Sequence, residues 1–287
     1  MRILRMEFYK VLHQRRMILV VAALGLFSFV LQLGFRFQGR NPLVFVARRA
    51  NLDPDLILNA INSTRLIMNS CYYLFLPLLT AMIFAGMIAG ERASGTLWGV
   101  LSRPVSRQGL LAAKFAVSTF TLCLVVLFFV GFTLAVGVTL FGVHDFMTAS
   151  VVFELLDTDN RAVLPFSEGV FRLFLCAMLL TYLLLPMGAL SFYCSVLFRN
   201  THSAMAAALL LFFMSYILQG LGSIDWLPVF GTIRPFLFTT AMESWMYVFQ
   251  PEIGWGDIWP RAVLHAVYIG ALFSAAMVHF QQIDLCE

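Results

Sequence analysis

The sequence predicts an all-α polytopic membrane protein with an N-terminal amphipathic helix, six transmembrane helices and re-entrant or interfacial helices between spans five and six. Hydrophobic residues make up 61% of the 287 positions and charged residues only 12%, about half the ~25% charge of a typical soluble domain. Long uncharged stretches recur along the chain, and no linker rich in Gly or Ser divides them. We therefore expect residues 1–287 to form a single transmembrane domain.

The spans are predicted from uncharged stretches that reach the roughly 20 residues needed to cross the hydrocarbon core. Their length and uniform apolar character favour helices over barrel strands, and these are the two structures that satisfy backbone polar groups in lipid. The six stretches are Met17–Phe35, Leu66–Gly90, Phe115–Phe141, Leu173–Phe198, Ser203–Ile224 and Ala262–Phe280.

The N-terminal segment 1–16 has the pattern of a basic amphipathic helix. Its apolar residues Ile3, Leu4, Phe8, Val11 and Leu12 fall on one face at helical spacing, and this arrangement suits a helix in the inner headgroup layer. An alternative is that the segment serves only as a positive-inside topology signal. The residues expected at the membrane surface are Arg2, Arg5, Lys10, Arg15 and Arg16.

Basic residues also set the expected orientation. They are concentrated in segment 1–16 and in the short connection 91–110, and Lys and Arg in short segments favour the cytoplasmic side. Both termini are therefore expected in the cytoplasm. The acidic segment 144–168 then lies outside, where we interpret it as a solvated loop, because it lacks the full pattern of a calcium-binding loop.

The segment 221–260 is expected to form short helices at the outer surface. It contains four of the five tryptophans and four prolines, and Trp concentrates at membrane–water interfaces. We interpret it as a re-entrant or interfacial element, since broken backbone at membrane depth must pack against protein or line a cavity.

The connection 91–110 between spans two and three is the most informative segment for function. Residues Thr96–Leu101 predict a short helix with Leu97, Val100 and Leu101 on one side. Pro104 would end that helix, and Ser106 can cap the helix that continues into span three. A short helix held between two spans would let a cytoplasmic partner move both spans together.

The residues of this connection resemble the signature of ABC type-2 permeases, the membrane subunits of a large class of ABC exporters. The pattern runs from Glu91 through Gly95-Thr96-Leu97 to Leu101-Ser102, continues with Pro104-Val105-Ser106-Arg107, and is followed by Lys114. The resemblance implies that residues 94–102 are a coupling helix that docks on a separate ATPase. The implied coupling residues are Glu91, Gly95, Thr96, Leu97, Leu101, Arg103, Pro104, Ser106 and Arg107.

The resemblance also implies the partners and the location. The implied partners are a cytoplasmic ABC ATPase dimer, a second permease copy (identical or related) and membrane lipids. No nucleic acid is expected to bind. The membrane would be the plasma membrane of a bacterium or an archaeon. The chain itself has no Walker A loop, so ATP and magnesium would be bound by the partner.

Other functional classes find less support in the residues. The chain has no H-E-x-x-H and no G-x-S-x-G motif, so we expect no catalytic residues and no metal site. The alternative is a secondary transporter or channel, or a structural membrane subunit. A secondary transporter or channel would call for charged residues buried within its spans, and the six stretches carry none. His265 and His279, near the ends of the last span, could relay protons, but a structural placement is favoured.

Overall fold

The computed structural model describes residues 6–10, 15–37, 53–101, 106–148, 162–224 and 228–282, and these are mostly helical. Five helices are long and apolar enough to cross a membrane, and a sixth span is counted if one bent helix pair is taken as a single crossing. The five are α2 (Arg15–Phe37), α9 (Arg107–Phe141), α10 (Phe166–Leu197), α11 (Thr201–Leu221) and α14 (Trp255–Gln282). The prediction of a polytopic helical membrane protein is confirmed at this level.

The second predicted span is broken, which corrects the expectation of one continuous helix over 66–90. It consists of α5 (Ala60–Tyr72) and α6 (Phe75–Ala85), which meet at an angle of 57°. Pro77 explains the break, because it cannot donate a hydrogen bond to the carbonyl of Tyr73 four residues earlier and its ring clashes with that carbonyl. The break at Tyr73 and Leu74 lies four and three residues before this proline.

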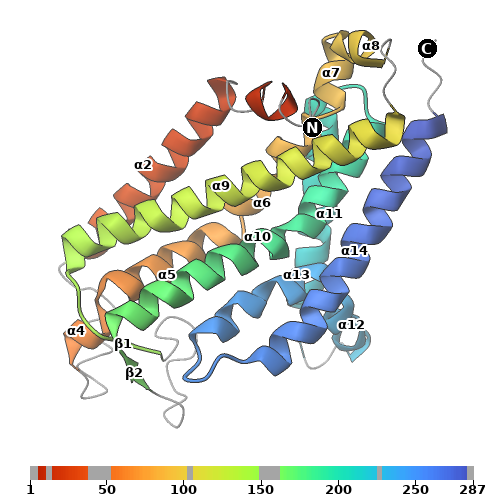
Figure 1. Cartoon of the computed structure of the whole chain (residues 1–287). Helices are drawn as coiled ribbons and strands as arrows, with labels where there is room; N and C mark the ends of the chain where they lie inside the picture. Colours follow the sequence, from red (N-terminus) through yellow and green to blue (C-terminus); the bar gives the residue numbers. More distant parts are fainter. Residues whose placement is uncertain are drawn as a thin grey trace.

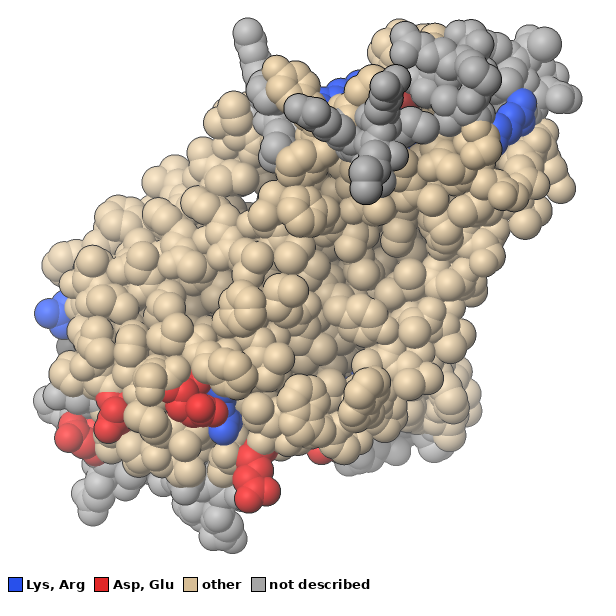
Figure 2. Space-filling view, viewed as in Figure 1, with Lys and Arg blue, Asp and Glu red and all other residues tan. Residues whose placement is uncertain are grey.

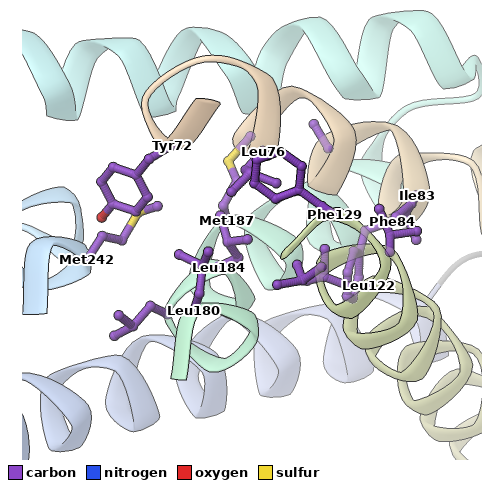
Figure 3. Close-up of a cluster of buried hydrophobic side chains, with 14 of the residues drawn as sticks. Tyr72, Leu76, Ile83, Phe84, Leu122, Phe129, Leu180, Leu184, Met187 and Met242 are labelled. Carbon is purple, nitrogen blue, oxygen red and sulfur yellow. The ribbon is translucent and has the colours of Figure 1, made fainter. Parts of the chain in front are cut away.

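Helix α10 is at the centre of the bundle. It packs against α6, α9, α11 and α14, while α2 packs along α9 (Figure 1). In the most apolar window of α10, 61% of residues are buried, against 28% for α2 and α11 and 17% for α14. The core at this centre is apolar and includes Leu180, Leu184 and Met187 of α10 beside Leu76 and Phe84 of α6 (Figure 3). The outer faces of α2, α11 and α14 are left uncovered.

The ends of α9 show how local sequence sets the helix boundaries. Ser106 caps the first turn, as predicted, because its Oγ accepts a hydrogen bond from the amide of Gly109 at 3.2 Å. Gly142 follows the last turn with a φ of 77°, a backbone conformation that strongly favours glycine.

A small β-hairpin corrects the all-α prediction in detail. Strand β1 (Phe146–Met147) pairs with β2 (Val163–Leu164) in an antiparallel two-stranded sheet. The short helix α4 (Pro54–Ile57) lies at the same end of the molecule (Figure 1). We call this the hairpin end. The opposite end carries the helix at residues 6–10, the last turn of α14, and the helices α7 (Ala89–Ala93) and α8 (Thr96–Leu101); we call it the α8 end.

Between α11 and α14 the chain forms short helices, as expected for residues 221–260. They are α12 (Pro228–Ile233), the 3₁₀ helix η1 (Arg234–Phe236), α13 (Phe238–Met242) and the 3₁₀ helix η2 (Glu243–Phe249). Helix α13 packs against α10, α11 and α14, and residues such as Met242, Trp245 and Phe249 are buried. The segment is thus packed against protein, and its depth in a membrane stays a prediction.

Charged side chains are distributed as a membrane protein requires. In the face shown in Figure 2, the described Lys, Arg, Asp and Glu residues lie near the two ends of the molecule. The band between them on this face carries uncharged residues, as the hydrocarbon core would demand.

Candidate functional site

Helices α7 and α8 form the short helical segment that follows the second span. Gly95 lies between them with a φ of 70°, and this left-handed conformation lets the chain turn sharply at little steric cost. The structure thus divides the predicted helix 94–102 into a turn at residues 94–95 and the helix α8 at Thr96–Leu101.

Helix α7 is fixed to the end of α10 by hydrogen bonds. Ser195 of α10 uses its Oγ to accept from the amides of Ile88 and Ala89, at 3.0 and 3.1 Å, and so satisfies donors at the start of α7 that lack helical partners. At the other end of α7, Arg92 Nη1 donates to the carbonyl of Val196 at 3.2 Å. Helix α7 is therefore held at both of its ends against the last turns of α10.

A cluster of four charged residues, which we call the charged node, joins α7 to two further helices. Glu91 of α7 pairs with Lys10 of the N-terminal helix and, at 2.8 Å, with Lys114 of α9. The ammonium group of Lys114 also donates to Glu7 Oε2 at 2.9 Å. The side chains of Glu7, Glu91 and Lys114 are 4%, 8% and 1% exposed, whereas that of Lys10 is 45% exposed. Two acids and two bases thus balance in a largely buried site.

The electrostatics of the node favour an ionised Glu91. Burial alone would raise the pKa of its carboxyl group, but the charge of Lys114 and the hydrogen bonds from Lys10 and Lys114 outweigh burial and lower the pKa below 4.5. Buried charges are tolerated when they are paired and hydrogen-bonded. Removal of a single partner leaves an uncompensated charge, which costs far more than the intact network contributes.

One described side chain of α8 is buried. Leu97 is only 4% exposed and packs into the hydrophobic core, so it holds α8 against the bundle, and its role in coupling stays a prediction. Among the residues of the segment whose burial the structure describes, Ala93, Ser94, Gly95, Thr96 and Gly99 are exposed. The backbone of Leu101 ends α8, and Arg103 and Pro104 lie outside the described residues.

Arg107 makes an intramolecular contact. Its Nη1 donates to the carbonyl of Gln281 at 3.1 Å and to that of Phe280 at 3.5 Å, and these groups belong to the last turn of α14. A cation at a helix C-terminus satisfies free carbonyls and complements the helix dipole. Arg107 therefore joins the start of α9 to the end of α14.

The residues expected at the membrane surface receive different placements. Lys10 belongs to the charged node. The backbone of Arg15 and Arg16 forms the first turn of α2, while Arg2 and Arg5 lie outside the described residues. In the helix at residues 6–10, Phe8 packs on Phe120 with ring centroids 5.2 Å apart.

Sequence reasoning missed Glu7 and Lys114 as site residues. The chain has only two lysines among its nineteen basic residues, Lys10 and Lys114, and both belong to the node. That rarity was an available signal, because Arg is used at every other basic position. The burial of Lys114 could not be inferred, because the predicted uncharged stretch began at Phe115, one residue later, and left Lys114 outside the span.

A second buried cation, Arg172, fixes the helices of segment 221–260. Its Nη1 and Nη2 donate to the carbonyls of Val248 and Pro251 at 3.1 and 3.0 Å, and Nη1 also contacts the carbonyl of Gln250. Arg172 also pairs with Glu168, one turn earlier in α10, at 2.9 Å. The end of η2 is thereby attached to α10, the helix that also holds α7.

Among the residues that the structure describes, no group of three or more His, Cys, Asp or Glu side chains could hold a metal ion. The bundle and its uncharged band (Figure 2) are those of a polytopic helical membrane protein. The chain belongs to the ABC-2 family of transporter proteins, whose family model matches residues 1–285. This confirms the resemblance based on the residues 91–114. No curated protein matches the chain significantly.

Proposed function

We propose that this chain is the membrane-spanning permease subunit of an ATP-driven exporter, in which a separate ATPase binds the α7–α8 segment. The observation that carries the proposal is the convergence of contacts on α7. The N-terminal helix, α9 and α10 all bind this five-residue helix through charged or capping interactions. A push on α8 would therefore move several spans together.

The proposed orientation places the α8 end in the cytoplasm of a bacterial or archaeal cell, with both termini on that side. The ATPase binds ATP and magnesium, and this chain contributes no catalytic residue. Two permease copies, identical or related, would face each other across a pathway. The weakly covered faces of α2, α11 and α14 support contacts with a second copy or with lipid.

The docking surface of the ATPase is assigned to the exposed side of α8. Thr96 and Gly99 are exposed there, while Leu97 is buried. A partner would contact Thr96 and Gly99, and the burial of Leu97 would hold α8 rigidly against the bundle. The N-terminal helix, whose exposed Met6 and Tyr9 are available to lipid, is proposed to lie along the inner membrane surface.

The test is copurification of the tagged full-length chain from native membranes. We expect a protein with a Walker A loop to copurify with the wild type, and Thr96→Glu to abolish this by placing a charge on the docking surface. Thr232→Glu is the matched control, because Thr232 is an exposed threonine of α12, outside α7 and α8. Retention of the ATPase by Thr96→Glu, or absence of any ATPase from the wild-type preparation, would contradict the proposal.

A secondary transporter or structural subunit is the alternative, and membership in the ABC-2 family disfavours it. In that case no ATPase would copurify under any condition of the experiment.

A further inference from the structure

A group of buried polar atoms lies where the break in the second span meets α11 and the junction of α13 and η2. Glu243 begins η2, Gln219 is in the last turn of α11, Tyr72 is the last residue of α5, and Tyr73 follows it at the break. Gln219 Nε2 donates to Glu243 Oε1 at 2.6 Å, and the Tyr73 hydroxyl donates to the same oxygen at 3.4 Å. The end of α11 and the residue after α5 thus each bring a hydrogen-bond donor to the carboxylate of η2.

Packing holds these elements in place around Glu243. Ser215 of α11 and Thr239 of α13 are both buried, and their hydroxyl oxygens are 3.0 Å apart. Figure 3 shows Tyr72 pointing from α5 toward Met242, the residue before Glu243. Buried contacts between α11, α13 and α5 therefore hold the elements around Glu243 in place.

Glu243 differs from the acids of the charged node because both of its hydrogen-bond donors are neutral. Among the described residues it forms no ion pair, whereas Glu7, Glu91 and Glu168 each pair with a Lys or Arg. Burial raises the pKa of the Glu243 carboxyl group, and the charges of Arg234 of η1 and Arg261 of α14 offset only part of that rise. The guanidinium group of Arg261, however, lies over the ring of Tyr247 at 4.5 Å.

Several neighbours of Glu243 have polar atoms that are buried and have no hydrogen-bond partner among the described residues. They include Gln219 Oε1 and the Tyr72 hydroxyl oxygen, in residues 5% and 2% exposed. Both oxygens can accept hydrogen bonds. Buried polar groups without partners are rare in folded proteins and often indicate a bound water, ion or ligand.

Aromatic rings complete the surroundings. The rings of Tyr73 and Tyr216 have centroids 5.3 Å apart, and that of Tyr72 lies 4.8 Å from Tyr73 and 6.0 Å from Trp245. Tyr216 is 37% exposed and Leu74 is 50% exposed, so the cluster adjoins an uncovered apolar face. Aromatic faces attract cations, most strongly where water is excluded.

We infer that Glu243, Gln219, Tyr72 and the ring of Tyr216 form a binding site for a primary ammonium group carried by an amphipathic amine. An ammonium group has three N–H donors and no acceptor, and it matches a carboxylate surrounded by free oxygen acceptors. The apolar body of the amine would contact the exposed face beside Leu74 and Tyr216. The inference identifies the chemical class of the transported substrate, and in that respect it rests on the proposed permease function.

The experiment measures binding of phenethylamine to the purified full-length chain in lipid nanodiscs by titration calorimetry, without any ATPase. Phenethyl alcohol, which has the same apolar body and no charge, is the control ligand. We expect saturable binding of the amine and at least tenfold weaker binding of the alcohol. Glu243→Gln should weaken amine binding at least tenfold, while Glu252→Gln, which removes an exposed carboxylate from the same connection between α11 and α14, should leave it unchanged.

Substitutions at Tyr216 test the site without touching the buried carboxylate. Tyr216→Phe keeps the ring and should retain binding, whereas Tyr216→Leu should weaken it several-fold. Thermal unfolding of each variant checks that the fold is kept. Absence of saturable amine binding, equal binding of the alcohol, or unchanged binding by both Glu243→Gln and Tyr216→Leu would overturn the inference. Because no ATPase is present, a failure to dock the ATPase would leave these results unaffected.

Discussion

At the residue scale, Lys114 connects the N-terminal helix to the α7–α8 segment. Its ammonium group lies within 2.9 Å of Glu7 and within 2.8 Å of Glu91, and its side chain is 1% exposed. A lysine is strongly hydrated in water, so its burial is tolerated only because two carboxylates replace that hydration. We therefore treat Lys114 as the residue on which the charged node depends most.

The substitution Lys114→Met should destabilise the protein by about 3 kcal/mol, because it keeps the volume of the side chain but leaves two buried carboxylates with a single, partly exposed counter-charge. The measurement is thermal unfolding of the purified chain in nanodiscs. Lys10→Met is the matched control and should cost clearly less, since Lys10 is 45% exposed. Equal losses in the two variants would contradict the assignment of Lys114 as the central cation.

The lowered pKa of Glu91 predicts a pH dependence of stability. The carboxyl group has a lower pKa in the folded protein than its ordinary value of 4.5, so the unfolded state takes up a proton first as pH falls. The stabilisation is thus fully present above pH 4.5 and is lost as pH falls through the folded pKa. Unfolding temperatures measured between pH 7 and pH 3 should show this loss.

Glu91→Gln should be less stable than the wild type at neutral pH, and its stability should depend less on pH below 4.5. Glu252→Gln serves as the control because Glu252 is exposed and should retain the wild-type dependence. An identical acid response in the wild type and Glu91→Gln would contradict the proposed pairing of Glu91.

At the scale of single elements, the spans could be predicted from the sequence and the contacts between them could not. Uncharged runs of about 20 residues indicate crossings whatever the neighbours are, and the five long helices fall on five of these runs. The helix at 96–101 and the Ser106 cap of α9 also follow from local signals. The inward side chain of Leu97 depends on how α8 lies against the bundle, which short-range sequence does not define.

The charged node shows why the site itself was only partly predicted. Glu91 is expected from the resemblance, but Glu7 and Lys114 are separated by 107 positions along the chain and meet only after α9 packs beside the N-terminal helix. The break at Tyr73 and Leu74 is different, because Pro77 was a readable signal. The prediction of a continuous span over residues 66–90 was wrong because it did not take Pro77 as a helix break.

The break in the second span should depend on Pro77. Pro77→Ala restores a backbone donor for the carbonyl of Tyr73 and removes the clash, so α5 and α6 should join more continuously. Hydrogen exchange of the peptide spanning residues 73–79 should slow. Pro260→Ala in α14 is the control, since α14 continues through Pro260 without a break. Unchanged exchange in Pro77→Ala would show that tertiary packing, and not the proline, causes the bend.

At the scale of the whole molecule, α10 connects the two ends. It holds α7 through Ser195 at its last turns and holds η2 through Arg172 near its first turns. The helix is also the most enclosed of the candidate spans. A displacement that begins at α8 would reach segment 228–254 through this helix, which makes the proposed coupling a property of the whole bundle.

The charged node is the starting point of that proposed coupling. The most direct test is hydrogen exchange of residues 228–254 in the complex of the chain with its copurified ATPase, measured with and without MgATP and vanadate. The account predicts a nucleotide-dependent change in the wild-type complex, and its loss in the Lys114→Met complex although the ATPase is still bound. An unaltered nucleotide response in Lys114→Met, in a complex that retains the ATPase, would contradict it.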